Sequence, residues 1–281
     1  AVKHRLRDAF VWQHLPLPEL REECKKRGLE AAAGFGAEAD QRRTMTGRLL
    51  EHACMKAWEE FGIPAGVGDF ATAQQLMQEF GEIDGMSPQE LQEWYKKTGL
   101  PEERAIPPAE VVELLKKVTV WETFDDAELK RECARQKLAD CEGQSRQYMV
   151  EQLLLRDRVI AWDTRGFQAT RLASHDTAVH AVARFEAIQA MSNAELKKTY
   201  VGAGLPEETG MERGEILRDL KTVLIWELLP LLELQRDCLE RNLPIQEGST
   251  DGGEEERRSE LVRRLVTDMR VYRCRSTFIS R

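Results

Sequence analysis

The chain has 281 residues, of which 42% are hydrophobic and 32% charged, and its formal net charge is −8. This length and composition predict one to three folded, helix-rich domains. The negative charge disfavours a dedicated nucleic-acid binder, because phosphate backbones repel it. The most apolar stretch, Val223–Leu234, is interrupted by two glutamates and a proline, so no transmembrane helix is expected.

The first predicted element belongs to a segment that occurs three times, which we call the Trp/Cys segment. Every copy has a glutamate 7 residues after its tryptophan, a cysteine after 12 and a leucine after 17. These positions are Trp12, Glu19, Cys24 and Leu29, then Trp121, Glu128, Cys133 and Leu138, then Trp226, Glu233, Cys238 and Leu243. The spacing predicts an amphipathic helix whose free thiol is buried like a small apolar group.

The helices predicted between these segments also recur. Long helices are expected at about 44–61 and 147–165, amphipathic helices at 70–83 and 176–188, short helices after Ser87 and Ser192, and further helices at about 108–120 and 214–226. We therefore predict an all-α fold built from a tandem helical repeat of about 105 residues. The predicted units are 1–85 (partial), 86–190 and 191–281 (partial), with about a dozen helices in all.

The short helices have clear start and stop signals. Met-Ser-x-x-Glu-Leu, found at Ser87 and again at Ser192, predicts a capping box with a hydrophobic staple. Gly99 and Gly204 are expected to end these helices in the left-handed conformation. The glutamate pairs that follow, at 102–103 and 207–208, are predicted to be solvated capping groups rather than acid–base catalysts.

The repeated aromatic and thiol side chains are interpreted as a structural core. The predicted core positions are Trp12, Cys24, Trp58, Trp121, Cys133, Trp162, Trp226 and Cys238. Tryptophans could instead stack on bases or pigments, and one cysteine per unit could be reactive. Fixed places in an amphipathic repeat favour wedges between helices and reduced, buried thiols.

The Trp/Cys segment resembles the SAP motif, a small helix-extended-helix module. The resemblance rests on an opening helix with Glu-Leu at 19–20, 128–129 and 233–234, a turn at 28–29, 137–138 and 242–243, a loop arginine at 42, 146 or 258, and paired apolar residues at 49–50, 153–154 and 265–266. It implies helical hairpins and, from the family, DNA binding. The loop is longer than the family's and is acidic in the third copy, which weakens the implied ligand more than the implied fold.

The C-terminal end has a charge opposite to that of the whole chain. Residues 257–281 contain eight arginines against Glu260 and Asp268. The predicted partner-binding residues there are Arg257, Arg258, Arg263, Arg264, Arg270, Tyr272, Arg273 and Arg275. Such an end is either a solvated tail or a docking arm for an acidic protein surface, lipid head groups or nucleic acid.

No catalytic, cofactor or metal site is predicted. The sequence contains no dinucleotide, Walker, nucleophile-elbow or zinc-protease motif and no Cys-x-x-Cys pair. The five histidines have no ligand spacing, since His175 and His180 are five residues apart.

Two functions remain from different classes. The first is a non-catalytic interaction scaffold or accessory subunit of a larger assembly, in a reducing compartment. Because the sequence begins with Ala1, it is either a processed mature form or a fragment. In the first case we expect an organellar protein, plastid or mitochondrial, peripheral to a membrane complex such as a photosystem-antenna assembly. The alternative is a SAP-like DNA- or RNA-binding protein, favoured if Arg42, Arg43, Arg146, Arg257 and Arg258 share one face, and disfavoured if they pair with glutamates.

Overall fold

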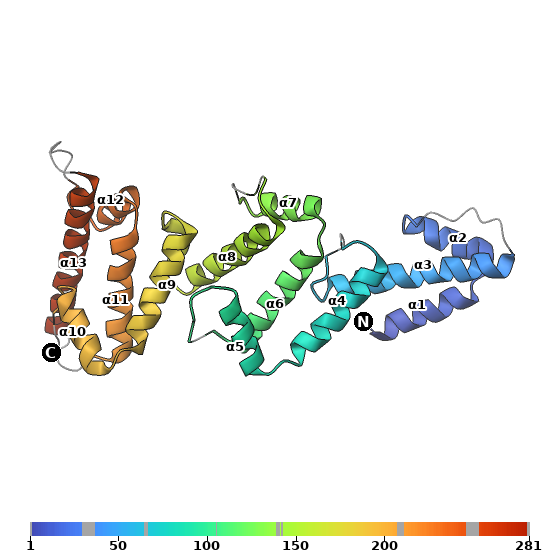
Figure 1. Ribbon diagram of the computed structural model, residues 1–281, viewed down its shortest axis with the longest axis horizontal. Helices are drawn as coiled ribbons and strands as arrows, with labels where there is room; N and C mark the ends of the chain where they lie inside the picture. The colour runs from blue at the N-terminus through green and yellow to red at the C-terminus, as the bar shows by residue number, and fades with distance from the viewer. Residues whose placement is uncertain are drawn as a thin grey trace. The chain divides into compact units, whose positions relative to one another are not determined.

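The computed structural model describes residues 2–29, 37–64, 67–104, 106–138, 141, 143–206, 211–245 and 253–279. Within these ranges the chain forms thirteen α-helices and one short 3-10 helix, with no β-strand (Figure 1). The all-α class predicted from the sequence is therefore confirmed.

The helix bounds agree closely with the predicted ones. The helices are α1 (Val2–His14), α2 (Leu17–Lys26), α3 (Glu38–Glu59), α4 (Phe70–Asp84), α5 (Pro88–Lys97), α6 (Pro108–Thr123), α7 (Asp126–Arg135), α8 (Arg146–Thr164), η1 (Ala169–Arg171), α9 (His175–Ala190), α10 (Asn193–Gly202), α11 (Arg213–Leu228), α12 (Leu231–Glu240) and α13 (Glu254–Ile279). Among the helices with a predicted range, the largest difference is at α3, which begins at Glu38 rather than near residue 44. Its first turn contains Glu38 and Asp40, and acidic side chains stabilise a helix N-terminus. No helix is predicted from the sequence for α1, and the end predicted as a tail or docking arm is helical as far as Ile279.

Several of the predicted helix ends are confirmed. Ser192 and Glu195 form the capping box that opens α10. The Asp125 carboxylate accepts the Glu128 amide at 2.7 Å at the start of α7. Gly99 and Gly204 adopt left-handed φ angles of 75° and 82°. Local sequence signals therefore fix where these helices start and stop.

Contacts divide the chain into two compact units. The first comprises residues 1–87 and 112–132, and the second comprises residues 88–111 and 133–281. In the first unit, α1, α2 and α3 enclose a core of Trp12, Leu20, Cys24, Met45 and Leu49. Farther along α3, Trp58 is only partly buried and stacks on Phe70 of α4 at a centroid distance of 5.1 Å. Trp58 thus differs from Trp12, Trp121, Trp162 and Trp226, which are buried.

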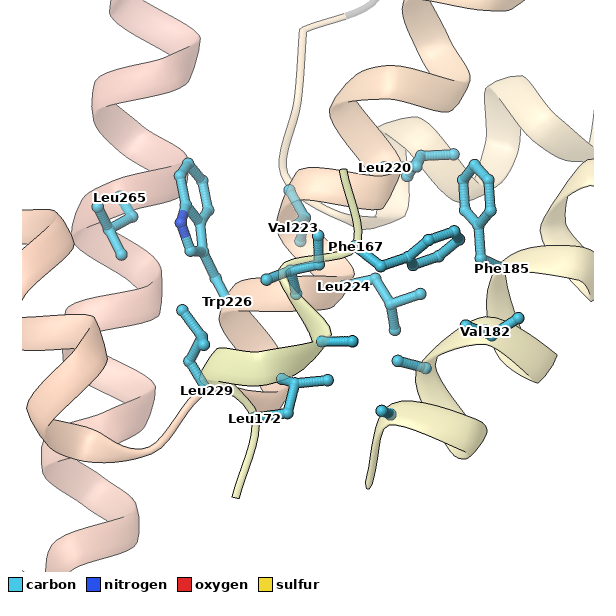
Figure 2. Close-up of a cluster of buried hydrophobic side chains, with 14 of the residues drawn as sticks. Phe167, Leu172, Val182, Phe185, Leu220, Val223, Leu224, Trp226, Leu229 and Leu265 are labelled. Atoms are coloured by element: carbon cyan, nitrogen blue, oxygen red, sulfur yellow. The ribbon is translucent and has the colours of Figure 1, made fainter. Parts of the chain in front are cut away.

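The second unit is organised around α11, which packs against α9, α10 and α13. Figure 2 shows Trp226 of α11 beside Leu265 of α13, within a continuous cluster of buried side chains. At the other side of this cluster, Phe167 meets the ring of Phe185 on α9 edge-on at 5.3 Å. Apolar residues at helical spacing on α11 therefore hold its three neighbours together.

Each Trp/Cys segment turns in the same way after its ten-residue helix. The residue four positions after the cysteine has a positive φ, at Gly28 (68°), Lys137 (59°) and Asn242 (56°). The leucine that follows donates its amide to the carbonyl of the cysteine, at distances of 3.0, 3.0 and 2.9 Å. This bond satisfies a carbonyl at the end of the helix and sends the chain away from it.

Candidate functional site

The most concentrated polar group in the second unit surrounds the carboxylate of Glu103, in the segment between α5 and α6. Its Oε1 accepts the Tyr95 hydroxyl at 2.7 Å, an Arg158 guanidinium nitrogen at 2.6 Å and the Trp162 indole N–H at 2.8 Å. Its Oε2 accepts Arg165. Only 3% of the side chain is exposed. Four donors therefore compensate the burial of one charge.

A second carboxylate completes the group, which we call the Glu103 cluster. Glu110, in the first turn of α6, accepts Arg158 at 2.6 Å and also accepts Arg165. Both arginines come from α8 and the residue after it, so each guanidinium bridges the two carboxylates. Two positive and two negative charges balance, although Nε of the fully buried Arg158 has no hydrogen-bond partner in the described part of the chain.

Electrostatics favour the charged forms of Glu110 and Arg158 and the neutral form of Tyr95. Burial would raise the pKa of Glu110, but hydrogen bonds and attraction from Arg158 and Arg165 hold it below its ordinary value. Burial would lower the pKa of Arg158, but Glu103, Tyr95 and Glu110 raise it. Burial and the charge of Glu103 raise the pKa of the Tyr95 phenol. The cluster is thus suited to fixing segments 55 to 62 residues apart against each other.

The prediction that both glutamates after Gly99 are solvated is wrong for one of them. Glu102 is exposed and pairs with Lys96 at 3.0 Å, as expected. Glu103 is buried, because its four donors on α5, on α8 and just after α8 surround it. Three of these donors are distant in sequence, so the Gly-Leu-Pro-Glu-Glu pattern could not predict the burial. The second predicted pair, residues 207–208, lies outside the described residues.

A small cavity lies beside this cluster. It has a volume of about 210 Å³ and is lined by Pro88, Leu91, Gln92, Tyr95, Lys96, Glu102, Glu103, Arg104, Ile106, Pro108 and Val111. Pockets that enclose small ligands usually measure about 300 Å³ or more. The cavity is therefore too small to enclose a substrate of ordinary size, and two of its polar lining residues, Tyr95 and Glu103, already bond within the cluster.

A related group, the Asp237 cluster, lies between η1 and α12. Asp237 accepts the Trp226 indole N–H at 2.9 Å and Arg171 at 2.5 Å. Arg171 also donates to Glu233 at 2.5 Å. Burial would lower the pKa of Arg171, but the two carboxylates raise it. Again one carboxylate holds both an indole and a guanidinium.

The acidic residue of this second cluster has counterparts that the sequence analysis missed. An acid stands directly before each repeated cysteine, at Glu23, Glu132 and Asp237. Three residues after the cysteine, Arg27 and Arg241 lie over the Trp12 and Trp226 rings at 5.1 and 5.0 Å. The constant spacing of 11 residues between the tryptophan and the acid could have identified these acidic residues from the sequence.

Two of the three loop arginines predicted for the Trp/Cys segments bind helix ends. Arg42 donates to the carbonyl of Gln13 at 3.1 Å, and Arg258 donates to that of Glu227 at 2.9 Å. Each acceptor directly follows the tryptophan of its segment. Arg258 also donates to Leu229 O at 3.0 Å and pairs with Glu255 at 3.0 Å. Neither Arg146 nor Arg257 is without a partner, whereas Arg43 is exposed.

The arginines predicted to bind a partner are divided along α13. Arg263 and Arg264 both pair with Glu260, at 2.5 and 2.8 Å. Beyond them Arg270 is exposed, and 72% of Tyr272 is exposed. The side chains of Arg273 and Arg275 lie outside the described part of α13. Arg257 and Arg263 are exposed too, but each has an interaction within the chain, so the exposed arginines without a described partner begin at about residue 270.

The described residues offer neither a metal centre nor a membrane span. The described residues contain no group of three or more potential metal ligands. None of the described helices is long and apolar enough to cross a bilayer. The chain matches no protein-family model, no curated protein and no solved structure.

Proposed function

We propose that this protein is a non-catalytic interaction scaffold or accessory subunit of a larger assembly. The observation that carries the proposal is the outer face of α12. Leu232 and Leu239 on this helix are 78% and 65% exposed. Residues seven positions apart lie on the same face of a helix, so the two leucines form an exposed apolar pair two turns apart, with Gln235 and Arg236 between them.

This exposed leucine pair is specific to the third Trp/Cys segment. The positions that match Leu232 and Leu239 by their distance from the cysteine are Pro18 and Lys25 in the first segment. In the second they are Ala127 and Ala134. Burial of a leucine is worth about 1.5–3 kcal/mol, so two exposed leucines where the related helices have smaller or polar residues favour a protein-docking role.

The proposed architecture behind this function is a tandem repeat of SAP-like hairpins. Support comes from the equal lengths of α2, α7 and α12, and of α6 and α11, together with the shared turn geometry after each cysteine. Repeats of this kind present one face per unit to partners. We further propose an organellar setting, peripheral to a membrane complex of the photosystem-antenna type, which identification of the partners would test.

The alternative, SAP-like binding of DNA or RNA, is less well supported. Arg42 and Arg258 donate to helix-end carbonyls, so phosphate contacts would have to compete with these bonds. The net charge of −8 opposes binding as well. What favours this alternative is Arg43 and the exposed basic end of α13.

The test begins with the native size of the protein in extract, followed by mass spectrometry of comigrating proteins. We expect a defined complex that survives nuclease and moderate salt. Leu232→Ser with Leu239→Ser should release the protein from it, whereas the control Phe61→Ser with Ile160→Ser should not. The control side chains are 61% and 44% exposed, so their replacement should also leave the fold intact.

Two outcomes would contradict the proposal. If the Leu232→Ser, Leu239→Ser protein still comigrates with the complex, this face of α12 does not bind the partner. A free species that binds duplex DNA or RNA, with affinity that falls steeply as salt rises, would favour nucleic-acid binding instead.

A further inference from the structure

A groove in the first unit lies between α1 and α2. It has a volume of about 530 Å³ and is lined by Asp8, Val11, Trp12, Leu15, Pro18, Glu19, Glu22, Glu23, Lys26 and Arg27. A volume of this size can hold several side chains of a docked peptide. The groove forms because α1 ends at His14 and α2 begins at Leu17, with Pro16 between them as the N-cap of α2.

The groove has an apolar floor. Val11 is 44% exposed, while Leu15 and Pro18 also face the groove. Trp12 is buried beneath them, and its ring is held by the Arg27 guanidinium at 5.1 Å. Such a surface gains free energy when another apolar side chain covers it.

The rim of the groove is acidic, with four carboxylates and two basic groups. The basic groups are neutralised locally, since Lys26 and Arg27 both pair with Glu23, at 2.8 and 2.5 Å. Glu19 and Glu22 are exposed and form no ion pair with another described residue. The groove therefore suits a ligand that combines positive charge with an apolar anchor.

The chain itself carries a segment with this chemistry. Residues 270–281 contain four arginines and no acidic residue. At the start of the segment, Val271 and Tyr272 are 44% and 72% exposed. An exposed tyrosine beside arginines is typical of the residues that anchor interfaces.

We propose that the groove between α1 and α2 of one molecule binds residues 270–281 of a second copy. The two surfaces differ, so the contact is heterologous and leaves a free groove and a free basic end on every pair. Association of this kind grows into chains of molecules, unless the geometry closes a ring. It is separate from the proposed partner contact on α12, since it uses neither Leu232 nor Leu239.

Sedimentation velocity of the full chain at rising concentration tests the proposal. We expect the average mass to increase with concentration at low salt and to fall as salt rises. Glu19→Lys with Glu22→Lys should make the protein monomeric. The control Glu51→Lys with Glu93→Lys changes the net charge equally at exposed acids outside the groove, and should leave association intact.

A labelled synthetic peptide of residues 270–281 tests the site directly. It should bind the full chain and bind the Glu19→Lys, Glu22→Lys protein at least about tenfold more weakly, because attraction becomes repulsion. Replacing the peptide arginines with glutamate should reverse this preference. The Leu232→Ser, Leu239→Ser protein should bind normally, which separates this contact from the one on α12.

Three results would overturn the proposal. These are a protein that stays monomeric at every concentration, a groove variant that associates like its control, and a peptide whose Val271→Ser, Tyr272→Ser form binds equally well. The last would mean that basic charge alone is attracted, without docking on the apolar floor.

Discussion

The Glu103 and Asp237 clusters have the same arrangement of charged and indole groups but differ in how deeply they are buried. In each, one carboxylate accepts both an indole N–H and a guanidinium, with Trp162 in the first and Trp226 in the second. Each links segments more than 50 residues apart. The side chain of Arg158 is 1% exposed, however, whereas that of Arg171 is 23% exposed. If the carboxylate were lost, Arg158 would therefore have no water to solvate its charge, whereas Arg171 would remain in contact with water.

The largest expected effect is at Glu103. Glu103→Gln should lower the free energy of unfolding of the second unit by about 3–5 kcal/mol, because it leaves Arg158 buried without full charge compensation. Urea unfolding followed by tryptophan fluorescence would measure it. Replacing both partners, as Glu103→Leu with Arg158→Met, should cost less than Glu103→Gln. If Glu103→Gln were as stable as the native chain, the deeper burial of the Glu103 cluster would have no energetic consequence.

At Asp237 the expected effect is smaller. Asp237→Asn should cost about 1–3 kcal/mol, since it weakens the bonds to Trp226 and Arg171 but leaves Arg171 in contact with water and Glu233. The same urea titration applies. Glu240→Gln on the exposed side of α12, where the partner is Arg236, serves as the control and should change stability little. A loss equal to that of Glu103→Gln would show that depth of burial does not decide the cost.

The smallest effects are expected at the rims of the clusters. The side chains of Glu110 and Glu233 are 31% and 30% exposed, so Glu110→Gln and Glu233→Gln should each cost about 1 kcal/mol or less. The pKa of Glu110 is lowered by folding. Its contribution is therefore full above the ordinary glutamate pKa and is lost as the pH falls through the lower folded value. Unfolding measured across this acidic window should show the native chain and Glu110→Gln converging in stability. A gap between them that does not change with pH would contradict this assignment.

The sequence predicts the helices better than it predicts the two clusters. Apolar spacing and caps such as Ser192 place most helix ends, because those interactions lie within a few residues of each other. The burial of Glu103 depends on donors such as Arg158 and Trp162, which lie 55 and 59 residues away. Gly-Leu-Pro-Glu-Glu alone is therefore equally compatible with two solvated carboxylates.

The Asp237 cluster was closer to being predictable. The acid before each cysteine recurs with the tryptophan at a fixed spacing, and the loop arginines at 42 and 258 recur as well. The resemblance to the SAP motif implies DNA binding, in which these arginines would contact phosphate groups. Their bonds to the Gln13 and Glu227 carbonyls show that a basic loop residue can serve a helix end instead.

The buried thiols described above also make the two units separately observable. Cys24 belongs to the first unit and Cys238 to the second, and burial raises the pKa of both. A shielded thiol reacts with an alkylating reagent only when its surroundings open. The rate of modification at each cysteine, read by mass spectrometry of peptides, therefore gives the opening free energy of each unit in the unaltered chain. The protein thereby carries at least one internal reporter of local unfolding in each unit.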